Sequence, residues 1–408
     1  MTATMALIAM GFISEASAAN AIYFTGSTAF RANAFTVLSA STASGGVWDA
    51  TPNIATRGNA TANKGNDMLF HGTISGTETF VSCHWSGSEA GLASVAGNTI
   101  DNGGTPLAGA PAKFLKTDGS VAYTEIAPAA SGTELESSTR AGDLALADTS
   151  STVSLSSTYP FAPFGTVGIV PFTWVKNTNS SPTAAWTDLK NITHDQARTV
   201  LGFPQKAVLF TGNPAETTYV YAVGRNKGSG TRVNCLADCG YPISKGVVQF
   251  SIGGLPFSGG LDLEEVDNDG YESGGDVAKA LGVDGSLQQT DPNFGGTGWM
   301  AVGYLGTSDA AALPVSPNWL TLNGVLESDG AVEEGQYSYW GNEHLYGQSD
   351  VISNSAKQYQ EDFANLFGTK LNASLGGTVT TAHSGGIQTG LMNAEKLSDT
   401  SAPSRINP

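Results

Sequence analysis

The sequence predicts an α/β protein with largely parallel sheets. Apolar runs of β type alternate with segments of helical apolar spacing across residues 20–310, which is typical of parallel strands joined by helices. Three strand-to-helix junctions share a turn of glycine and hydroxyl residues, namely TGSTAFR (25–31), WSGSEAG (85–91) and GRNKGSGTR (224–232). With 408 residues and 40% hydrophobic content, the chain can form two domains or one large elaborated domain with real cores.

The charge balance excludes some classes of partner. The chain has 36 acidic and 19 basic residues, a net charge of −17, and charged residues make up only 13% of it. Non-specific binding to nucleic acid or to an anionic membrane needs a basic surface, so neither is expected. Low charge with abundant Gly, Ser, Thr, Ala and Asn suits a secreted protein that is rich in turns.

Residues 1–18 have the pattern of a signal peptide. An apolar run at 5–13 is followed by the small residues of an A-x-A cleavage pattern at 16–18, which places the mature start at Ala19 or a near neighbour. The run is too short to span a bilayer, and the alternative is a buried N-terminal helix. We therefore expect a periplasmic or secreted protein.

The first half of the chain is expected to form strands, helices and two long insertions. AIYFTG is a strand, and Ser27 or Thr28 is the expected N-cap of the helix that follows it. Residues 41–80 are polar and indicate a loop, and residues 92–140 contain a long excursion rich in Gly, Ala, Pro and Ser. Three further elements are expected here: the strand TFVSCHW, the helix SGSEAGLASVAG and the strand LALADTS, which ends at Asp148.

The second half continues the alternation of strands and helices. The run VGIVPFTWVKN (167–177) is strongly of β type, and NITHDQARTVLG is a helix that Asn191 or Thr193 opens and Gly202 closes. The remaining expected elements are the strands TTYVYAVGR and WMAVGYLG and the helices ESGGDVAKALG and AKQYQEDFANLF.

The cysteines and the acidic residues suggest few other sites. CLADC (235–239) could close a disulfide in an oxidising compartment, which the sequence leaves open, and Cys83 would then be unpaired. Zinc is not expected, since no histidine lies near these cysteines. EEVDNDGYESGGD (264–276) resembles a calcium loop with both end residues exchanged, so a solvated acidic turn is the preferred interpretation.

The three glycine and hydroxyl turns indicate an anion site. A helix N-terminus offers unpaired N–H groups and a partial positive charge, and small residues let an anion approach them. Serine and threonine hydroxyls add donors, and Arg225 can add a charge-assisted, bidentate contact. One such turn is usually only a helix cap, so the prediction depends on the three turns together. Arg31 is a further candidate, whereas Lys227 and Arg232 are expected to lie away from the ligand.

These motifs resemble the phosphate-binding proteins of bacterial ABC phosphate importers, which have the type II periplasmic binding protein fold. GSTAF resembles the family's first anion-binding turn, SGSEAG the second, and GRNKGSGTR the arginine with its Ser-Gly-Thr turn. LALADTS resembles the strand that ends in the aspartate recognising protonated phosphate. The resemblance covers most of residues 20–310 in order. In SGSEAG, Glu89 departs from the glycine-rich pattern. Its carboxylate would repel an anion if it faced inward, whereas an early helix residue can also point outward, and the sequence leaves the two orientations open.

The resemblance implies two lobes, each with a central mixed, mostly parallel sheet. Lobe one would comprise 19–165 plus 311–408, and lobe two 166–310. A buried carboxylate such as Asp148 accepts a hydrogen bond from a protonated oxyanion but repels sulfate, which selects phosphate. The ligand-binding residues that the resemblance implies are Thr28, Ala29, Ser88, Asp148, Arg225, Ser229, Gly230 and Thr231.

The function implied is that of an exported substrate-binding protein. It would capture phosphate, or a similar tetrahedral oxyanion, in a cleft between the lobes and deliver it to the membrane subunits of an ABC importer. The sequence contains no nucleophile elbow and no metal-spaced ligand set, so no enzyme activity, cofactor or metal is expected. The alternative is a surface or extracellular structural protein that self-assembles and reuses this fold, since the long insertions and low charge suit that role.

Overall fold

The computed structural model describes residues 19–97, 112–154, 156–254, 262–285, 299–377 and 381–406. The predicted signal peptide (1–18) lies outside these residues, as do positions 98–111 of the second insertion. Among the described helices, none is both long and apolar enough to cross a membrane.

A ten-stranded mixed sheet runs through the molecule in the order β2-β3-β4-β1-β5-β14-β6-β12-β9-β8. The long strand β6 (Ala162–Lys176) pairs with β14 (Trp340–Gly347) over its first part and with β12 (Trp299–Gly306) over its last part. The other strands of this sheet are β1 (Asn20–Gly26), β2 (Asn53–Arg57), β3 (Asp67–Ile74), β4 (Thr77–His84), β5 (Leu144–Ala147), β8 (Gln205–Lys206) and β9 (Tyr219–Val223).

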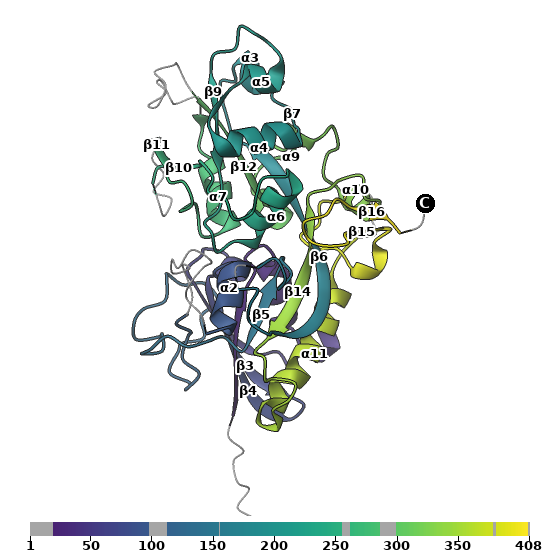
Figure 1. The fold of residues 1–408 in the computed structure, drawn as a ribbon. Coiled ribbons are helices and arrows are strands. Elements are labelled where there is room, and N and C mark those ends of the chain that lie inside the picture. Colours follow the sequence, from purple (N-terminus) through teal and green to yellow (C-terminus); the bar gives the residue numbers. More distant parts are fainter. Residues whose placement is uncertain are drawn as a thin grey trace, which may run out of the picture.

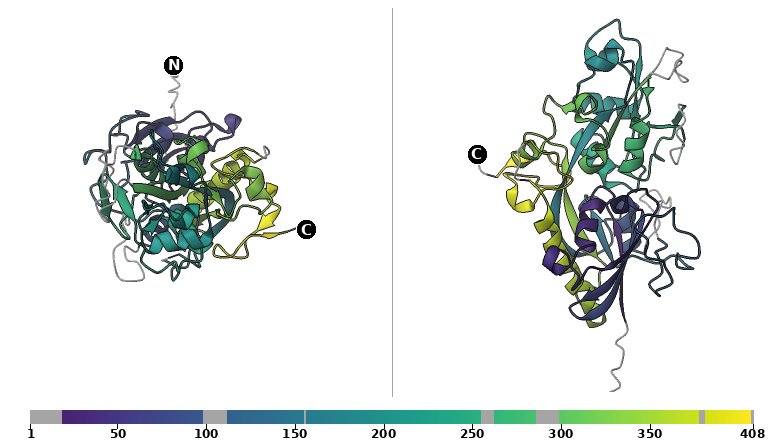
Figure 2. Two further views of the ribbon diagram at one scale, coloured as in Figure 1. Left: turned by 90° about the horizontal axis from the view of Figure 1, so that it is seen from above. Right: turned by 180° about the vertical axis from the view of Figure 1, so that it is seen from behind.

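The two parts of this sheet belong to two lobes (Figure 1). We call the lower part in Figure 1, with β1–β5 and β14, the first lobe, and the upper part, with β8, β9 and β12, the second lobe. Both β6 and β14 run along one side of the molecule, and the C-terminal segment lies on the same side (Figure 2). The helices of the first lobe are α1 (Arg31–Leu38), α2 (Ser88–Val95) and α11 (Gln358–Ser374), and those of the second lobe include α3 (Ala184–Asp188), α4 (His194–Gly202), α5 (Val208–Thr211), α6 (Gly230–Asp238) and α7 (Gly274–Leu281).

Short helices and two-stranded pairs complete the described part of the fold. The helix α8 (Thr307–Ala310) follows β12 directly and contacts β6. The strand pairs are β7 (Asn191–Ile192) with β13 (Thr321–Leu322), β10 (Phe250–Ile252) with β11 (Leu263–Glu265), and β15 (Ala394–Glu395) with β16 (Ser404–Arg405), and the remaining helices are α9 (Val315–Asn318) and α10 (Asp329–Glu333).

The sheet is mixed, as predicted, but antiparallel pairs predominate. Parallel pairing joins β1 to β4, β1 to β5 and β9 to β12. The antiparallel strands are those that cross between lobes, β6 and β14, and those at the two sheet edges, β2, β3 and β8. A chain that passes from one lobe to the other and back must run in opposite directions in its two crossover strands.

The prediction that residues 41–80 form a loop is wrong. This stretch contains β2 and β3, which extend the sheet of the first lobe beyond β4. Met68, Leu69 and Phe70 are fully buried on β3, so a short apolar run stabilises the strand within a polar stretch. Most of the second insertion, in contrast, is irregular from 112 to 140 and pairs only through isolated bridges.

The predicted helix caps are correct for α4 and wrong for α1. Thr193 caps α4 with a complete capping box. The first helix begins at Arg31, later than predicted, with Phe30 as its N-cap residue and no side-chain cap bond. Ser27 instead accepts the Phe30 N–H at 3.3 Å within the preceding turn.

The three cysteines are unpaired, and the acidic segment 264–276 leads into the capped start of α7. Cys83, Cys235 and Cys239 are all buried and free. Ser273 Oγ accepts the Asp276 N–H at 3.1 Å and caps α7. In the portion of the chain that the structure covers, no group of three or more His, Cys, Asp or Glu side chains could hold a metal ion.

Candidate functional site

The three glycine and hydroxyl turns meet where the two lobes touch. The first turn leads from β1 into α1, the second from β4 into α2, and the third from β9 into α6. Gly26 O accepts the Gly87 N–H at 3.0 Å, which joins the first turn to the second. Gly228 O accepts the Ala90 N–H at 3.1 Å, which joins the third turn to the second across the lobe junction. The N-termini of α2 and α6 therefore face the same place from opposite lobes.

Asp148 lies between these two helix N-termini. Its Oδ1 accepts a hydrogen bond from Ser88 Oγ at 2.6 Å, and its Oδ2 accepts a longer one from Thr231 Oγ1 at 3.4 Å. Asn234 Nδ2 donates to the Asp148 carbonyl at 2.7 Å. A Cβ on Gly230 would lie 1.6 Å from Asp148 Oδ1, so only glycine permits this approach. Three predicted residues, Ser88, Asp148 and Thr231, are thus joined across the lobes.

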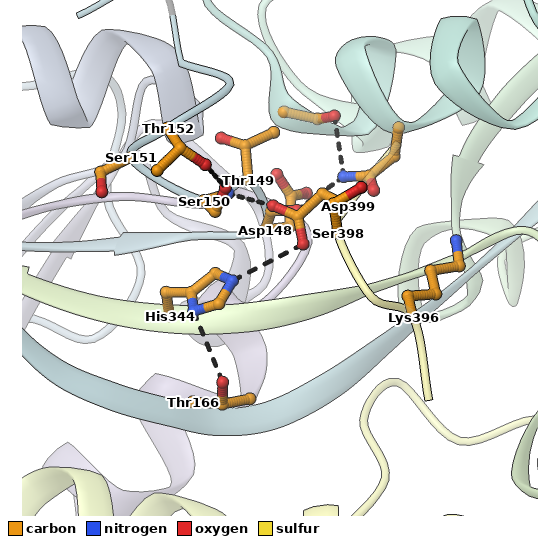
Figure 3. Close-up of polar contacts among 12 residues, drawn as sticks. Asp148, Thr149, Ser150, Ser151, Thr152, Thr166, His344, Lys396, Ser398 and Asp399 are labelled. Atoms are coloured by element: carbon orange, nitrogen blue, oxygen red, sulfur yellow. Dashed lines mark hydrogen bonds and ion pairs between the residues drawn. The ribbon is translucent and has the colours of Figure 1, made fainter. Parts of the chain in front are cut away.

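The carboxyl group of Asp148 is almost fully enclosed, with 1% of the residue exposed. Burial raises its pKa to about 6, because removal from water disfavours the charged form. The Ser88 hydrogen bond and the charge of Arg225 act in the opposite direction. Figure 3 shows Asp148 next to Thr149 and Ser150, where Asp399 of the C-terminal segment and His344 of β14 also lie.

Arg225 is buried at the same junction, with 1% of the residue exposed. Its Nε donates to Tyr271 O at 3.1 Å and its Nη2 to Glu272 O at 2.6 Å, which orients the guanidinium. Burial lowers its pKa, while the nearby carboxylates of Asp309 and Asp148 raise it. A buried cation of this kind needs an anionic partner to offset its desolvation.

Three other predicted residues, Ser229, Thr28 and Ala29, differ in their hydrogen bonding. Ser229 Oγ accepts the Arg232 N–H at 3.2 Å and so serves as the N-cap of α6. Thr28 Oγ1 is buried and has no hydrogen-bond partner in the described part of the chain. The carbonyl of Ala29 accepts a hydrogen bond from Ser308 Oγ at 3.2 Å, which brings the first turn against α8.

The structure adds Arg31 and Asp309 to the junction. Arg31 is buried, and its Nη1 donates to Asn66 Oδ1 at 2.7 Å, whereas its Nε finds no acceptor among the described residues. Asp309, in α8, is 3% exposed, and its Oδ1 lies 3.9 Å from Lys64 Nζ. The sequence marked Arg31 as a candidate. Asp309 was overlooked, although the same kind of glycine and hydroxyl turn, Gly306-Thr307-Ser308, joins β12 to α8 directly before it.

Glu89 faces inward, which is one of the two orientations that the sequence left open. It is buried and does not point outward: its two carboxylate oxygens accept hydrogen bonds from Thr149 Oγ1 at 2.6 Å and Ser154 Oγ at 2.9 Å. Both donors belong to the segment that follows Asp148. The departure from the glycine-rich pattern therefore serves to hold this segment against α2.

Arg232 is one of the two cations that were predicted to lie away from the ligand. Its Nη1 donates a hydrogen bond to Asn268 O at 3.1 Å.

No family model matches the chain, and no curated protein matches it. The chain is similar to solved structures of phosphate-binding proteins. One, from Clostridium perfringens, was solved with bound phosphate; it is 13% identical, with a TM-score of 0.44, and the match covers 87% of this chain and 97% of that chain. Another is an ABC-type phosphate transport receptor from Vibrio cholerae, 14% identical, with a TM-score of 0.40 and coverage of 85% and 93%.

Proposed function

We propose that this protein binds phosphate, or a similar tetrahedral oxyanion, at the junction of its two lobes. The observation that carries the proposal is a pair of buried donors without acceptors in the described structure, Thr28 Oγ1 and Arg31 Nε. A buried polar group without a partner costs about 1–3 kcal/mol. An oxyanion would supply both acceptors and would at the same time face the buried charge of Arg225.

The backbone of the site also favours an anion. The N-termini of α2 and α6 both lie at the junction, so the partial positive charges of the two helix dipoles act on the same volume. The proposed ligand contacts are the residues that the motifs implied, Thr28, Ala29, Ser88, Asp148, Arg225, Ser229, Gly230 and Thr231, together with Arg31. The overall negative charge does not prevent this, because distant charges are screened and near dipoles dominate.

The biological role that follows is capture of the anion outside the cytoplasm for an ABC importer. In this proposal the chain is exported to the periplasm or secreted, and it carries out no catalysis of its own. The ligand joins turns from both lobes, so binding favours a closed arrangement that membrane subunits of the importer can recognise.

Calorimetric titration with phosphate and with sulfate tests the proposal. We expect the wild-type protein to bind phosphate, and Arg225→Ala to weaken binding by about 100-fold, since a charged hydrogen-bond donor is lost from a buried site. The matched control is Arg198→Ala, which removes an arginine of the second lobe whose Nη2 pairs with exposed Asp195; it should bind as the wild type does.

Two outcomes would count against the proposal. Absence of phosphate binding by folded wild-type protein would reject it, and filaments in the same preparation would support the structural alternative. Equal weakening by Arg225→Ala and Arg198→Ala would mean that net charge, and not a site at the junction, governs anion binding. Thermal unfolding of each variant establishes that it is folded before titration.

A further inference from the structure

A hairpin near the C-terminus reaches the turn that follows Asp148. We call residues 394–405 the C-terminal hairpin: β15 and β16 form its stem, and Asp399 lies at its tip. The Asp399 carboxylate accepts a hydrogen bond from the Ser150 N–H, and its other oxygen lies 3.7 Å from His344 Nε2 (Figure 3). Asp399 is only 6% exposed, so the tip of the hairpin is seated against the first lobe.

The stem of the hairpin is fixed to the end of α10. The Asn393 N–H, at the base of the stem, donates to Glu333 O at 2.8 Å. Arg405, on the opposite strand of the stem, forms an ion pair with Glu334. Both strands of the hairpin are therefore anchored at the same place.

The segment between α10 and β14 binds helices of the second lobe. Ser338 Oγ lies 3.2 Å from Nε2 of His194, the first residue of α4. Tyr339 OH donates to the carbonyl of Thr231, in α6, at 3.0 Å. The side chain of Thr231 in turn donates to Asp148 across the lobe junction. The anchor of the C-terminal hairpin is thus attached to the second lobe, whereas its tip holds a turn of the first lobe.

The turn that the tip holds is the one that begins at Asp148. Glu89, in α2, accepts hydrogen bonds from Thr149 Oγ1 and Ser154 Oγ of this turn. Asp399 adds a contact from the hairpin. The turn is therefore held both from within its own lobe and from a segment that is attached to the other lobe.

The tip makes this contact with a charged group. Burial acts to raise the pKa of Asp399, but the interaction with His344 and the Ser150 N–H lower it overall. The carboxylate is therefore ionised near neutral pH, and its hydrogen bond from Ser150 is charge-assisted, which makes it about twice as strong as a neutral one. Between stem and tip, Lys396 Nζ donates to Trp340 O at 2.6 Å, which also holds the loop of the hairpin against β14.

We infer that the C-terminal hairpin is a strap that fastens the second lobe to the turn after Asp148 and so opposes separation of the lobes. When the N-terminus of α6 moves away from Asp148, one of the contacts between the tip of the hairpin and its anchor must break. Asp399 is a positioning residue in this arrangement, because it holds the turn and does not contact the ligand. The strap does not depend on the proposed function, but it would slow release of an anion from the junction.

Amide hydrogen exchange, followed by mass spectrometry, tests the strap without any ligand. The reporter is the Ala90 N–H, which binds Gly228 O across the lobe junction. For Asp399→Ala we expect this amide to exchange about 10-fold faster than in the wild type, since a charge-assisted hydrogen bond that opposes opening is lost. The matched control is Glu395→Ala, which removes an exposed carboxylate from the same hairpin and should leave the exchange of Ala90 unchanged.

Release kinetics test the consequence for the proposed anion site. Bound radiolabelled phosphate is chased with excess unlabelled phosphate, and we expect Asp399→Ala to release it about 10-fold faster, with little change in the association rate constant. Asp399→Asn keeps the size of the side chain and a neutral acceptor, so it should show a smaller increase. Glu395→Ala should release phosphate as the wild type does.

The outcomes separate this inference from the proposed function. If folded Asp399→Ala keeps the wild-type rates of Ala90 exchange and of phosphate release, the inference is wrong and the proposed function stands. If Ala90 exchange accelerates but folded wild-type protein binds neither phosphate nor sulfate, the strap stands and the proposed function fails. Faster exchange throughout the protein would mean that Asp399 only supports the fold, and it would reject the strap. Should Asp399→Ala not fold, unchanged Ala90 exchange in Asp399→Asn rejects the strap in the same way.

Discussion

At the scale of single residues, three buried carboxyl groups lie near the end of β5. Asp148, Glu89 and Glu343 are each almost inaccessible to solvent. Glu89 is satisfied by two hydroxyl donors, and Asp148 by hydroxyl donors from both lobes. Glu343 differs, because neither of its carboxyl oxygens makes a hydrogen bond of good geometry to a described residue, although the Ser27 side chain acts to lower its pKa. Protonation is the least costly way to keep such a group in the core.

Glu343→Gln should stabilise the protein increasingly as the pH rises. Burial raises the pKa of Glu343 well above its usual value of 4.5, and the charge of Asp148 adds to the effect. The folded state therefore binds more protons than the unfolded state above about pH 4.5, so wild-type stability falls as the pH increases through this range. Urea unfolding at pH 5 and pH 8 should show a small difference between variant and wild type at pH 5 and a larger gain at pH 8. A gain that is the same at both pH values would contradict the assignment.

Site residues could be predicted from sequence where they belong to a short motif. Ser88, Arg225 and Thr231 lie within or beside helix-initiating turns, and the structure brings these turns together. Asp309 also follows such a turn, Gly306-Thr307-Ser308 between β12 and α8, so it was overlooked although the signal was present. The orientation of Glu89 could not be decided from sequence, because its partners Thr149 and Ser154 are distant in the chain and approach it in the fold.

At the scale of structural elements, an ion pair between Arg57 and Glu134 attaches the irregular insertion, residues 112–140, to the sheet. Arg57, at the end of β2, donates from Nε to Glu134 Oε1 at 2.9 Å and from Nη2 to the carbonyl of Ala122 at 2.9 Å. Thr124 O accepts from Nη1 at 3.1 Å. A single buried guanidinium therefore holds three points of the insertion, which compensates for its lack of regular backbone pairing.

Glu134→Gln should destabilise the protein by about 1–3 kcal/mol at pH 7, because a charge-assisted hydrogen bond to a buried arginine is lost. The hydrogen bond from Arg57 lowers the pKa of Glu134 to about 2. Its stabilisation is thus present above pH 4.5 and disappears as the pH falls toward 2. Denaturant unfolding at pH 7 and pH 3 measures this, with limited proteolysis of residues 112–140 as a second readout. Glu136→Gln is the control and should have little effect at either pH, because Glu136 forms a longer ion pair of 3.4 Å with the exposed side chain of Arg140.

The elements predicted correctly share strong local signals. Thr193 with Gln196 forms the capping box of α4, and the apolar run of β12 is buried along its whole length. The strands β2 and β3 were missed because Gly, Asn and Thr dominate their surroundings. Their few apolar residues form a buried face only when β3 pairs with β4 and β2 with β3. Their identity as strands is thus set by tertiary contacts, which override local propensity.

At the scale of the whole molecule, the strand β6 connects the two halves of the sheet. Residues 162–171 of β6 belong to the first lobe and residues 172–176 to the second, with β14 beside it as the return path. The lobes also touch away from these strands, where Ala90 N–H binds Gly228 O. Any relative motion of the lobes must therefore bend β6 and β14 and separate the N-termini of α2 and α6.

Gly230→Ala should prevent the two lobes from closing at the contact between the N-termini of α2 and α6. A Cβ at this position would lie 1.6 Å from Asp148 Oδ1 and 2.7 Å from Ser88 Cβ, so the two helix N-termini could meet only with displacement. Such overpacking costs about 1–3 kcal/mol, which corresponds to phosphate binding weaker by about 5-fold to 150-fold. Small-angle scattering should show a smaller radius of gyration for wild-type protein when phosphate is added, and no such change for Gly230→Ala at the same concentration. Gly132→Ala, where a Cβ would meet nothing within 4 Å, should behave as the wild type does. If Gly230→Ala contracts on phosphate addition as the wild type does, the contact between Gly230 and Asp148 is not what limits closure, and the lobes must close around the anion by another path.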